Sequence, residues 1–122
     1  MAKKALIVWG GWKGHNPKEC ADLFRKVLTE AGCQVELADD LAVFADKDRL
    51  TAMDAIVPMW TMGQLGKEQA AGLSAAIKGG VGLAGFHGGM GDAFRENTEY
   101  QFMTGSQFVA HPGGKSPSYA VH

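Results

Sequence analysis

Residues Val81 to Asp92 read V-G-L-A-G-F-H-G-G-M-G-D, and this stretch gives the strongest indication of the fold. A short run of small apolar residues leads into closely spaced glycines, with His87 between them. Such a pattern is typical of a buried strand that turns sharply into a helix, which is where open α/β sheets place their ligands. We therefore expect a strand over 81–86, a turn at His87 and a helical segment from Asp92.

The segments before this stretch alternate between strand-like and helix-like patterns. Apolar runs predict strands over 5–9, 33–38 and 54–60. Apolar stripes at helical spacing predict two helices. The first starts after Asn16 and ends just before Gly32, and the second covers 67–78. Such alternation predicts a parallel sheet covered by helices on both faces, an α/β fold with three α/β/α layers. Pro58 lacks an amide donor, so strand pairing is expected to stop near it.

The overall composition excludes several classes of function. The chain has 122 residues, and its 12 Lys and Arg against 13 Asp and Glu are scattered, so neither nucleic acid nor a membrane is expected as a partner. Two cysteines are too few for a disulfide framework or a metal knuckle, which favours a reducing cytoplasm. Cys20 and Cys33 are interpreted as inert thiols. The apolar run near the N-terminus is too short for a signal peptide or a spanning helix.

Parallel strands bring the loops that follow them to one edge of the sheet, and this edge is the candidate site. We expect it to bring together Trp12, His15, Trp60, His87 and Asp92. The glycines around His87 fit the strand-to-helix elbow that presents a strained central residue to a cleft. Two interpretations of His87 stay open: a residue of a tight turn, or an acid/base group or metal ligand.

The histidines as a set also allow two interpretations. His15, His87 and His111 lie in loops that can reach the same edge, and three imidazoles suit Zn²⁺ or a similar divalent metal ion. Asp92 or Glu99 would then complete the metal site or act as a base. The alternative is that these histidines contact ligand hydroxyls directly or only close loops, because no two of them have a helical ligand spacing.

Aromatic residues near the strand ends suggest a sugar ligand. Trp12 and Trp60 are the candidates for lining the cleft, whereas Trp9 and Phe86 are expected in the core. The alternative for the first loop is a phosphate cradle assisted by Lys13.

The segment over 98–102 predicts a helical turn near the same cleft. Thr98 is expected to cap it, Phe102 to point inward, and Glu99 or Gln101 to face the cleft.

Four segments together resemble the ThuA-like family, named for trehalose utilisation. They are W-G-G-W-K-G-H (9–15), V-P-M-W-T-M-G (57–63), G-L-A-G-F-H-G-G-M-G-D-A-F-R (82–95) and T-E-Y-Q-F-M-T-G-S-Q-F-V-A-H-P-G (98–113). The resemblance implies a flavodoxin-like sheet within the class I glutamine amidotransferase-like superfamily, and a role in sugar metabolism. It does not imply amidotransferase activity, because His87 replaces the cysteine of the superfamily elbow and neither Cys20 nor Cys33 is at an equivalent position.

The resemblance and the clustered loops together favour an enzyme, a hydrolase or isomerase, that acts on a small sugar or keto-sugar. His87 and Asp92 are the expected catalytic residues, and the expected substrate contacts are Trp12, Trp60, Gly88, Gly89 and Glu99. The alternatives are a binding domain without catalysis, and an inactive piece. Family members are usually longer and a strand is expected over 118–122, so residues 1–122 are expected to be the N-terminal part of a longer single domain. Exposed sheet edges would then favour a homodimer.

Overall fold

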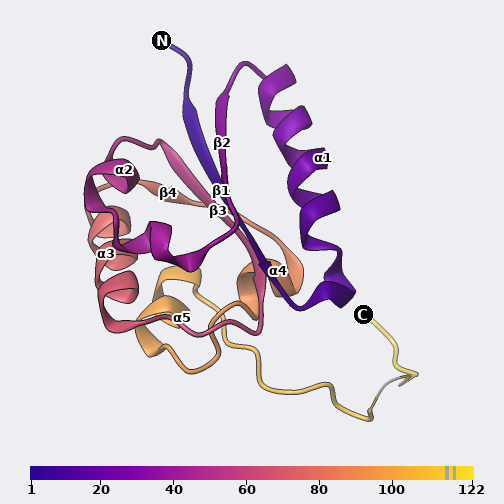
Figure 1. Cartoon of the computed structure of the whole chain (residues 1–122). Coiled ribbons are helices and arrows are strands. Elements are labelled where there is room, and N and C mark those ends of the chain that lie inside the picture. Colours follow the sequence, from indigo (N-terminus) through magenta and orange to yellow (C-terminus); the bar gives the residue numbers. More distant parts are fainter. Residues whose placement is uncertain (115, 117) are drawn as a thin grey trace.

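The computed structural model describes residues 1–114, 116 and 118–122, and a four-stranded parallel sheet lies at its centre (Figure 1). The strands are β1 (Lys4–Gly11), β2 (Gln34–Ala38), β3 (Ala55–Thr61) and β4 (Gly82–Leu83), in the order β2-β1-β3-β4. The helices are α1 (Pro17–Glu30), α2 (Lys47–Thr51), α3 (Lys67–Lys78), α4 (His87–Gly91) and α5 (Thr98–Thr104), with 3₁₀ turns η1 (Lys13–His15) and η2 (Leu41–Ala45). The predicted flavodoxin-like α/β architecture is confirmed.

The sheet is buried between two layers of helices. Helix α1 covers one face, and η2, α2, α3 and α5 lie on the other (Figure 1). Alternate residues of a strand point to opposite faces, so Leu6 belongs to the core cluster that includes Leu73 of α3, whereas its neighbour Ile7 belongs to the cluster that includes Ala21 of α1. The apolar run of β1 is therefore continuous because both of its faces are covered.

The strand order reverses direction between β1 and β3, and this reversal positions the site. The chain leaves β1 toward β2 through α1, on one face, and leaves β3 toward β4 through α3, on the other (Figure 1). The two connections diverge at the carboxyl ends of β1 and β3 and leave a crevice between them. This switch point is the edge at which the sequence predicted the functional loops.

The prediction that strand pairing stops near Pro58 is wrong for the β1 side of β3. The β1–β3 ladder continues to the pair Gly11 and Thr61. On the other side, the carbonyls of Asp54 and Ile56 accept hydrogen bonds from the amides of Gly82 and Ala84, and the strand pairing ends at Ile56. Since alternate residues face the same neighbour, the missing amide of Pro58 falls on the β4 side, where it shortens β4 and leaves the β1 ladder complete.

Two expectations about the extent of strands are wrong. The predicted strand over 81–86 contains only the two residues of β4, and Phe86 is 45% exposed instead of lying in the core. The helix that follows begins at His87 itself, with Asp92 as its C-cap, and not at Asp92. Residues 118–122 form neither a strand nor a helix.

The boundaries of α1 and α3 agree with the sequence, whereas some of the predicted caps do not. Helices α1 and α3 lie where they were predicted, and α1, with 14 residues, is the longest. Asn16 precedes α1 in a left-handed conformation without a side-chain cap bond, and Asn97, not Thr98, caps α5. Phe102 points outward and is 83% exposed. None of the described helices is long and apolar enough to cross a membrane.

Helix α3 lies against η2 at Gly72, where there is no room for a side chain. A Cβ at Gly72 would overlap the carbonyl oxygen of Phe44. We expect Gly72→Ala to lower the free energy of unfolding by about 1–3 kcal/mol, measured by urea denaturation, because either the helix or η2 must shift. Gly66→Ala is the matched control, since its Cβ would meet only the Gln69 side chain at 3.5 Å. Equal losses in the two variants would contradict this account.

Candidate functional site

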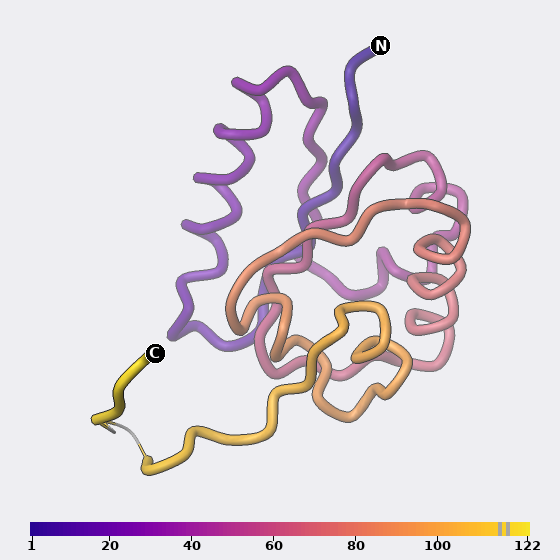
Figure 2. Tube along the Cα trace, turned by 180° about the vertical axis from the view of Figure 1, so that it is seen from behind, coloured from indigo at the N-terminus to yellow at the C-terminus, as the bar shows by residue number. Residues whose placement is uncertain are grey.

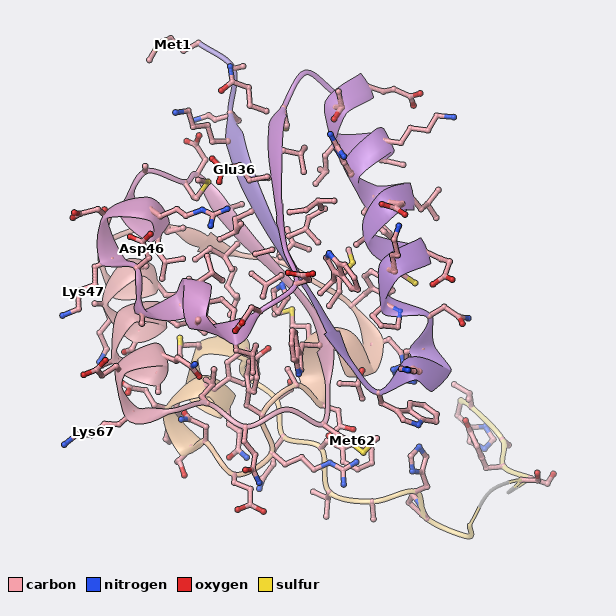
Figure 3. All side chains as sticks on the ribbon, in the orientation of Figure 1. Met1, Glu36, Asp46, Lys47, Met62 and Lys67 are labelled. Atoms are coloured by element: carbon pink, nitrogen blue, oxygen red, sulfur yellow. The ribbon has the colours of Figure 1, made fainter. Side chains whose placement is uncertain are left out.

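A cavity of about 490 Å³ lies at the carboxyl edge of the sheet. Its wall comes from the loop after β1, the end of β3, helix α4 and the segments that follow it. The lining residues are Trp12, His15, Thr61, Met62, His87, Gly88, Gly91, Asp92, Arg95, Phe108 and His111. A smaller cavity of about 120 Å³ shares His15, Thr61 and His87 with it. Figure 3 shows Met62 at this edge, and in Figure 2 the last, yellow segment of the chain leaves α5 from the same region.

Three of the loops at this edge contain a residue with a strained backbone. In the described chain, the residues other than glycine with positive φ are Asn16 (47°), Met62 (58°) and His87 (52°). They follow β1, β3 and β4 in turn, and His87 and Met62 line the main cavity. Left-handed conformations of such residues persist only where the surrounding structure holds them, and they cluster at functional sites.

His87 has the conformation that the glycine pattern predicted. It begins α4 with a φ of 52°, as the central residue of a strand-to-helix elbow does. Gly89 lets the helix approach the sheet, because a Cβ there would lie 3.2 Å from the Cα of Met59. The ring of His87 meets that of His15 edge-on, with the centroids 4.9 Å apart. The sequence therefore predicted both the elbow and the meeting of these two histidines.

His15 is fixed by three neighbours. Its Nδ1 lies 2.8 Å from Oγ1 of Thr61, the last residue of β3. The ring of Trp12 packs edge-on against it at 4.7 Å, and a Cβ at Gly88 would lie 2.6 Å from its Cε1. The imidazole therefore has little freedom to turn, and its Nε2 is the nitrogen left for a ligand.

Asp92 is paired with Arg95 through both of its carboxylate oxygens. Nε of Arg95 donates to Oδ1 of Asp92, and Nη2 donates to Oδ2 at 2.8 Å. The hydrogen bond to Asp92 raises the pKa of Arg95, and the guanidinium also lies over the ring of Phe108, 4.3 Å from its centroid. Both oxygens of the Asp92 carboxylate are thus engaged by one guanidinium, and this bidentate pair fixes Arg95 in the cavity wall.

The three histidines share one cavity without forming a metal site. His111 lines the wall beside Phe108, with a ring separation of 5.2 Å, whereas His15 and His87 contact each other. Within the part of the chain that the structure describes, no three His, Cys, Asp or Glu side chains are arranged to hold a metal ion. The predicted set of His15, His87 and His111 therefore does not fit a metal ion in this arrangement.

The structure does not bring two predicted contact residues to the main cavity. The ring of Trp60 lies over Gly10 and Gly63, on the opposite side of β3 from Thr61, and packs against the core. Glu99 accepts hydrogen bonds from Lys78 and Ser74, each at 2.6 Å, and these bonds lower its pKa. Both residues support the fold. Of the other predicted contacts, Trp12 and Gly88 line the main cavity, and Gly89 lines the smaller one.

Sequence reasoning missed five residues of the wall. They are Thr61, Met62, Gly91, Arg95 and Phe108, and each lies within a segment that carried the family resemblance. A signal was available for Arg95, because Asp and Arg three residues apart can pair when the chain between them is helical or turned. The other four do not form a motif or spacing that indicates a site, so only their place in the fold identifies them.

Helix α5 supports α4 through one buried hydrogen bond. The hydroxyl of Tyr100, a residue that is 1% exposed, donates to the carbonyl oxygen of Met90 at 2.6 Å. We expect Tyr100→Phe to lower the free energy of unfolding by about 1–3 kcal/mol, because the carbonyl loses its partner. Thermal or urea denaturation measures this, with Tyr119→Phe at an exposed position as the control. Equal stability of the two variants would contradict it.

The same tyrosine makes stability depend on alkaline pH. Burial raises the pKa of Tyr100 above its ordinary value of 10.0. The unfolded chain therefore releases this proton at a lower pH than the folded chain, so the stability is complete below about pH 10 and falls above it. Urea denaturation between about pH 8 and pH 11 should show a steeper fall for the wild type than for Tyr100→Phe. Parallel curves would show that the phenol does not cause the slope.

A known family matches nearly the whole chain. The family model described as ThuA, trehalose utilisation, matches residues 4–122, which include every strand and helix and all the residues that line the main cavity. Comparisons with curated proteins and with solved structures found no match. The resemblance noticed in the four sequence segments is thus confirmed over nearly the whole chain. The chain belongs to the ThuA family.

Proposed function

We propose that this chain is an enzyme of sugar utilisation that binds a small sugar or keto-sugar derivative in the main cavity. Membership of a family described by trehalose utilisation supports this substrate class. The volume of about 490 Å³ lies within the range of ~300–1,000 Å³ that is typical of small-molecule sites. Trp12, which is 50% exposed, offers an aromatic face to the C–H surface of a sugar ring.

In this proposal His87 is the general acid–base. The supporting observation is its strained backbone at the elbow, where it lines both cavities. Imidazole takes up and releases protons near neutral pH, so His87 would move a proton to or from an oxygen, or a carbon next to a carbonyl, of the ligand. No step is assigned to a metal ion, because the three histidines are not arranged to hold one.

Arg95, held by Asp92, binds the ligand in this proposal. Asp92 occupies one side of the Arg95 guanidinium, and the remaining N–H groups of Arg95 are available to ligand oxygens. Glutamine amidotransferase chemistry is not expected, because the elbow residue is His87 and Cys20 belongs to α1.

The test is a ligand screen followed by turnover measurements. Trehalose, glucose and a keto derivative of trehalose are screened by thermal shift, and the products of any stabilising compound are identified by mass spectrometry. We expect His87→Ala to lower turnover by about 10²–10⁴-fold while it keeps the melting temperature, since general acid–base catalysis contributes that much. His122→Ala, at an exposed position outside both cavities, is the control. Unchanged turnover in His87→Ala would remove His87 from the mechanism.

A binding domain without catalysis is the second candidate function. The observation that favours it is the pairing of Asp92 with Arg95, which leaves the main cavity wall without a free carboxylate among the described residues. The same screen separates the two functions. A compound that stabilises the protein and is recovered unchanged supports the binding domain, whereas conversion that depends on His87 supports the enzyme.

A further inference from the structure

The contact between Thr61 and His15 determines where the His15 proton lies. Thr61 ends β3, and its carbonyl oxygen accepts a hydrogen bond from the amide of Trp12 at 3.1 Å, so the strand pairing fixes its position. Thr61 as a residue is only 3% exposed, and its Oγ1 lies 2.8 Å from Nδ1 of His15. Among the described residues, the hydrogen-bond partner of the Thr61 hydroxyl is Nδ1 of His15.

A buried hydroxyl has one proton to donate, and leaving that proton without an acceptor is costly. Nδ1 of His15 can accept it only if Nδ1 itself carries no proton. The reverse arrangement, in which Nδ1–H donates to Oγ1, would leave the hydroxyl proton of Thr61 without an acceptor among the described residues. The arrangement of lower free energy is therefore the one in which the Thr61 hydroxyl donates to Nδ1. The proton of the neutral imidazole is then on Nε2.

We propose that Thr61 is a positioning residue that holds His15 in the tautomer with its proton on Nε2, so that His15 donates a hydrogen bond into the cavity. The ring cannot easily turn away, because Trp12, His87 and the backbone at Gly88 surround it. The two adjacent histidines then have different tasks. His15 is a fixed hydrogen-bond donor, and His87 remains the general acid–base of the proposed function.

The assigned tautomer also indicates which ligand group His15 would bind, and this part of the inference rests on the proposed function. An Nε2–H group binds an oxygen acceptor, such as a carbonyl or hydroxyl oxygen of a sugar derivative. If that oxygen gains negative charge during the reaction, the bond becomes stronger, as at an oxyanion hole. Thr61 would then affect the ligand only through His15.

The tautomer can be measured on the whole chain without any ligand. Protein with ¹⁵N-labelled histidine is studied by two-bond ¹H–¹⁵N correlation NMR at about pH 8.5, two units above the ordinary histidine pKa of about 6.5. We expect the signal of His15, assigned with His15→Gln, to show a protonated Nε2 and an unprotonated Nδ1. A proton on Nδ1, or an even mixture of tautomers, would overturn the proposal whether or not the protein has any activity.

Variants of Thr61 separate positioning from packing. Thr61→Val keeps the shape of the side chain and removes the hydroxyl, so the tautomer preference should be lost, and Thr61→Ser should restore it. Thr51→Val, whose hydroxyl bonds only within α2, is the matched control. An unchanged tautomer in Thr61→Val would overturn the role of Thr61, and the wild-type spectrum decides the tautomer even if this variant fails to fold.

A ligand measurement tests the donor role separately. The keto derivative of trehalose is titrated against the wild type, Thr61→Val and Thr61→Ser. We expect Thr61→Val to weaken binding by about three- to tenfold, the effect of one neutral hydrogen bond, and Thr61→Ser to recover it. Equal affinity for all three proteins would overturn the donor role. If the compound does not bind at all, the proposed function fails while the tautomer result still stands.

Discussion

β1 and β3 remain hydrogen-bonded along their whole length, from Ala5 and Ala55 to Gly11 and Thr61, and the site depends on this ladder. The ladder ends where the chain connections diverge, so the loop after β1 and the last residue of β3 meet at one point. His15 can bond to Thr61 only because β3 continues beyond Pro58. The missing amide donor of that proline faces β4, so the central pair of strands stays complete.

Much of the fold follows from local patterns. The alternation of apolar runs and helical stripes predicted the parallel sheet, and the glycines around His87 predicted the elbow, because few other sequences allow so sharp a turn. What local patterns cannot give is which neighbour each strand residue faces. The mistaken end of pairing at Pro58 and the mistaken place of Trp60 have this common cause, since β3 extends to Thr61 and adjacent residues of a strand point to opposite sides.

The sequence also did not predict which side chains pair with one another. Asp92 was expected in the site because its loop reaches the carboxyl edge of the sheet, and Glu99 because the helical turn over 98–102 was expected near the cleft. The structure gives each a basic partner, Arg95 for Asp92 and Lys78 for Glu99, and only the first pair faces the cavity. Ion pairs form between residues that the fold brings together, so the distance of a carboxylate from the elbow in the sequence does not show whether it is paired. The grouping of histidines at one edge was predictable, but their ring arrangement was not.

The shortness of β4 has a mechanical consequence for the elbow. Ala84 donates the last backbone bond to β3, at Ile56, and residues 84–86 belong to no strand. The elbow is therefore anchored from its helical side, where Gly89 lies on β3 and Tyr100 holds the carbonyl of Met90. The position of His87 therefore depends on the contacts that α4 makes with β3 and with α5, and not on strand pairing before the turn.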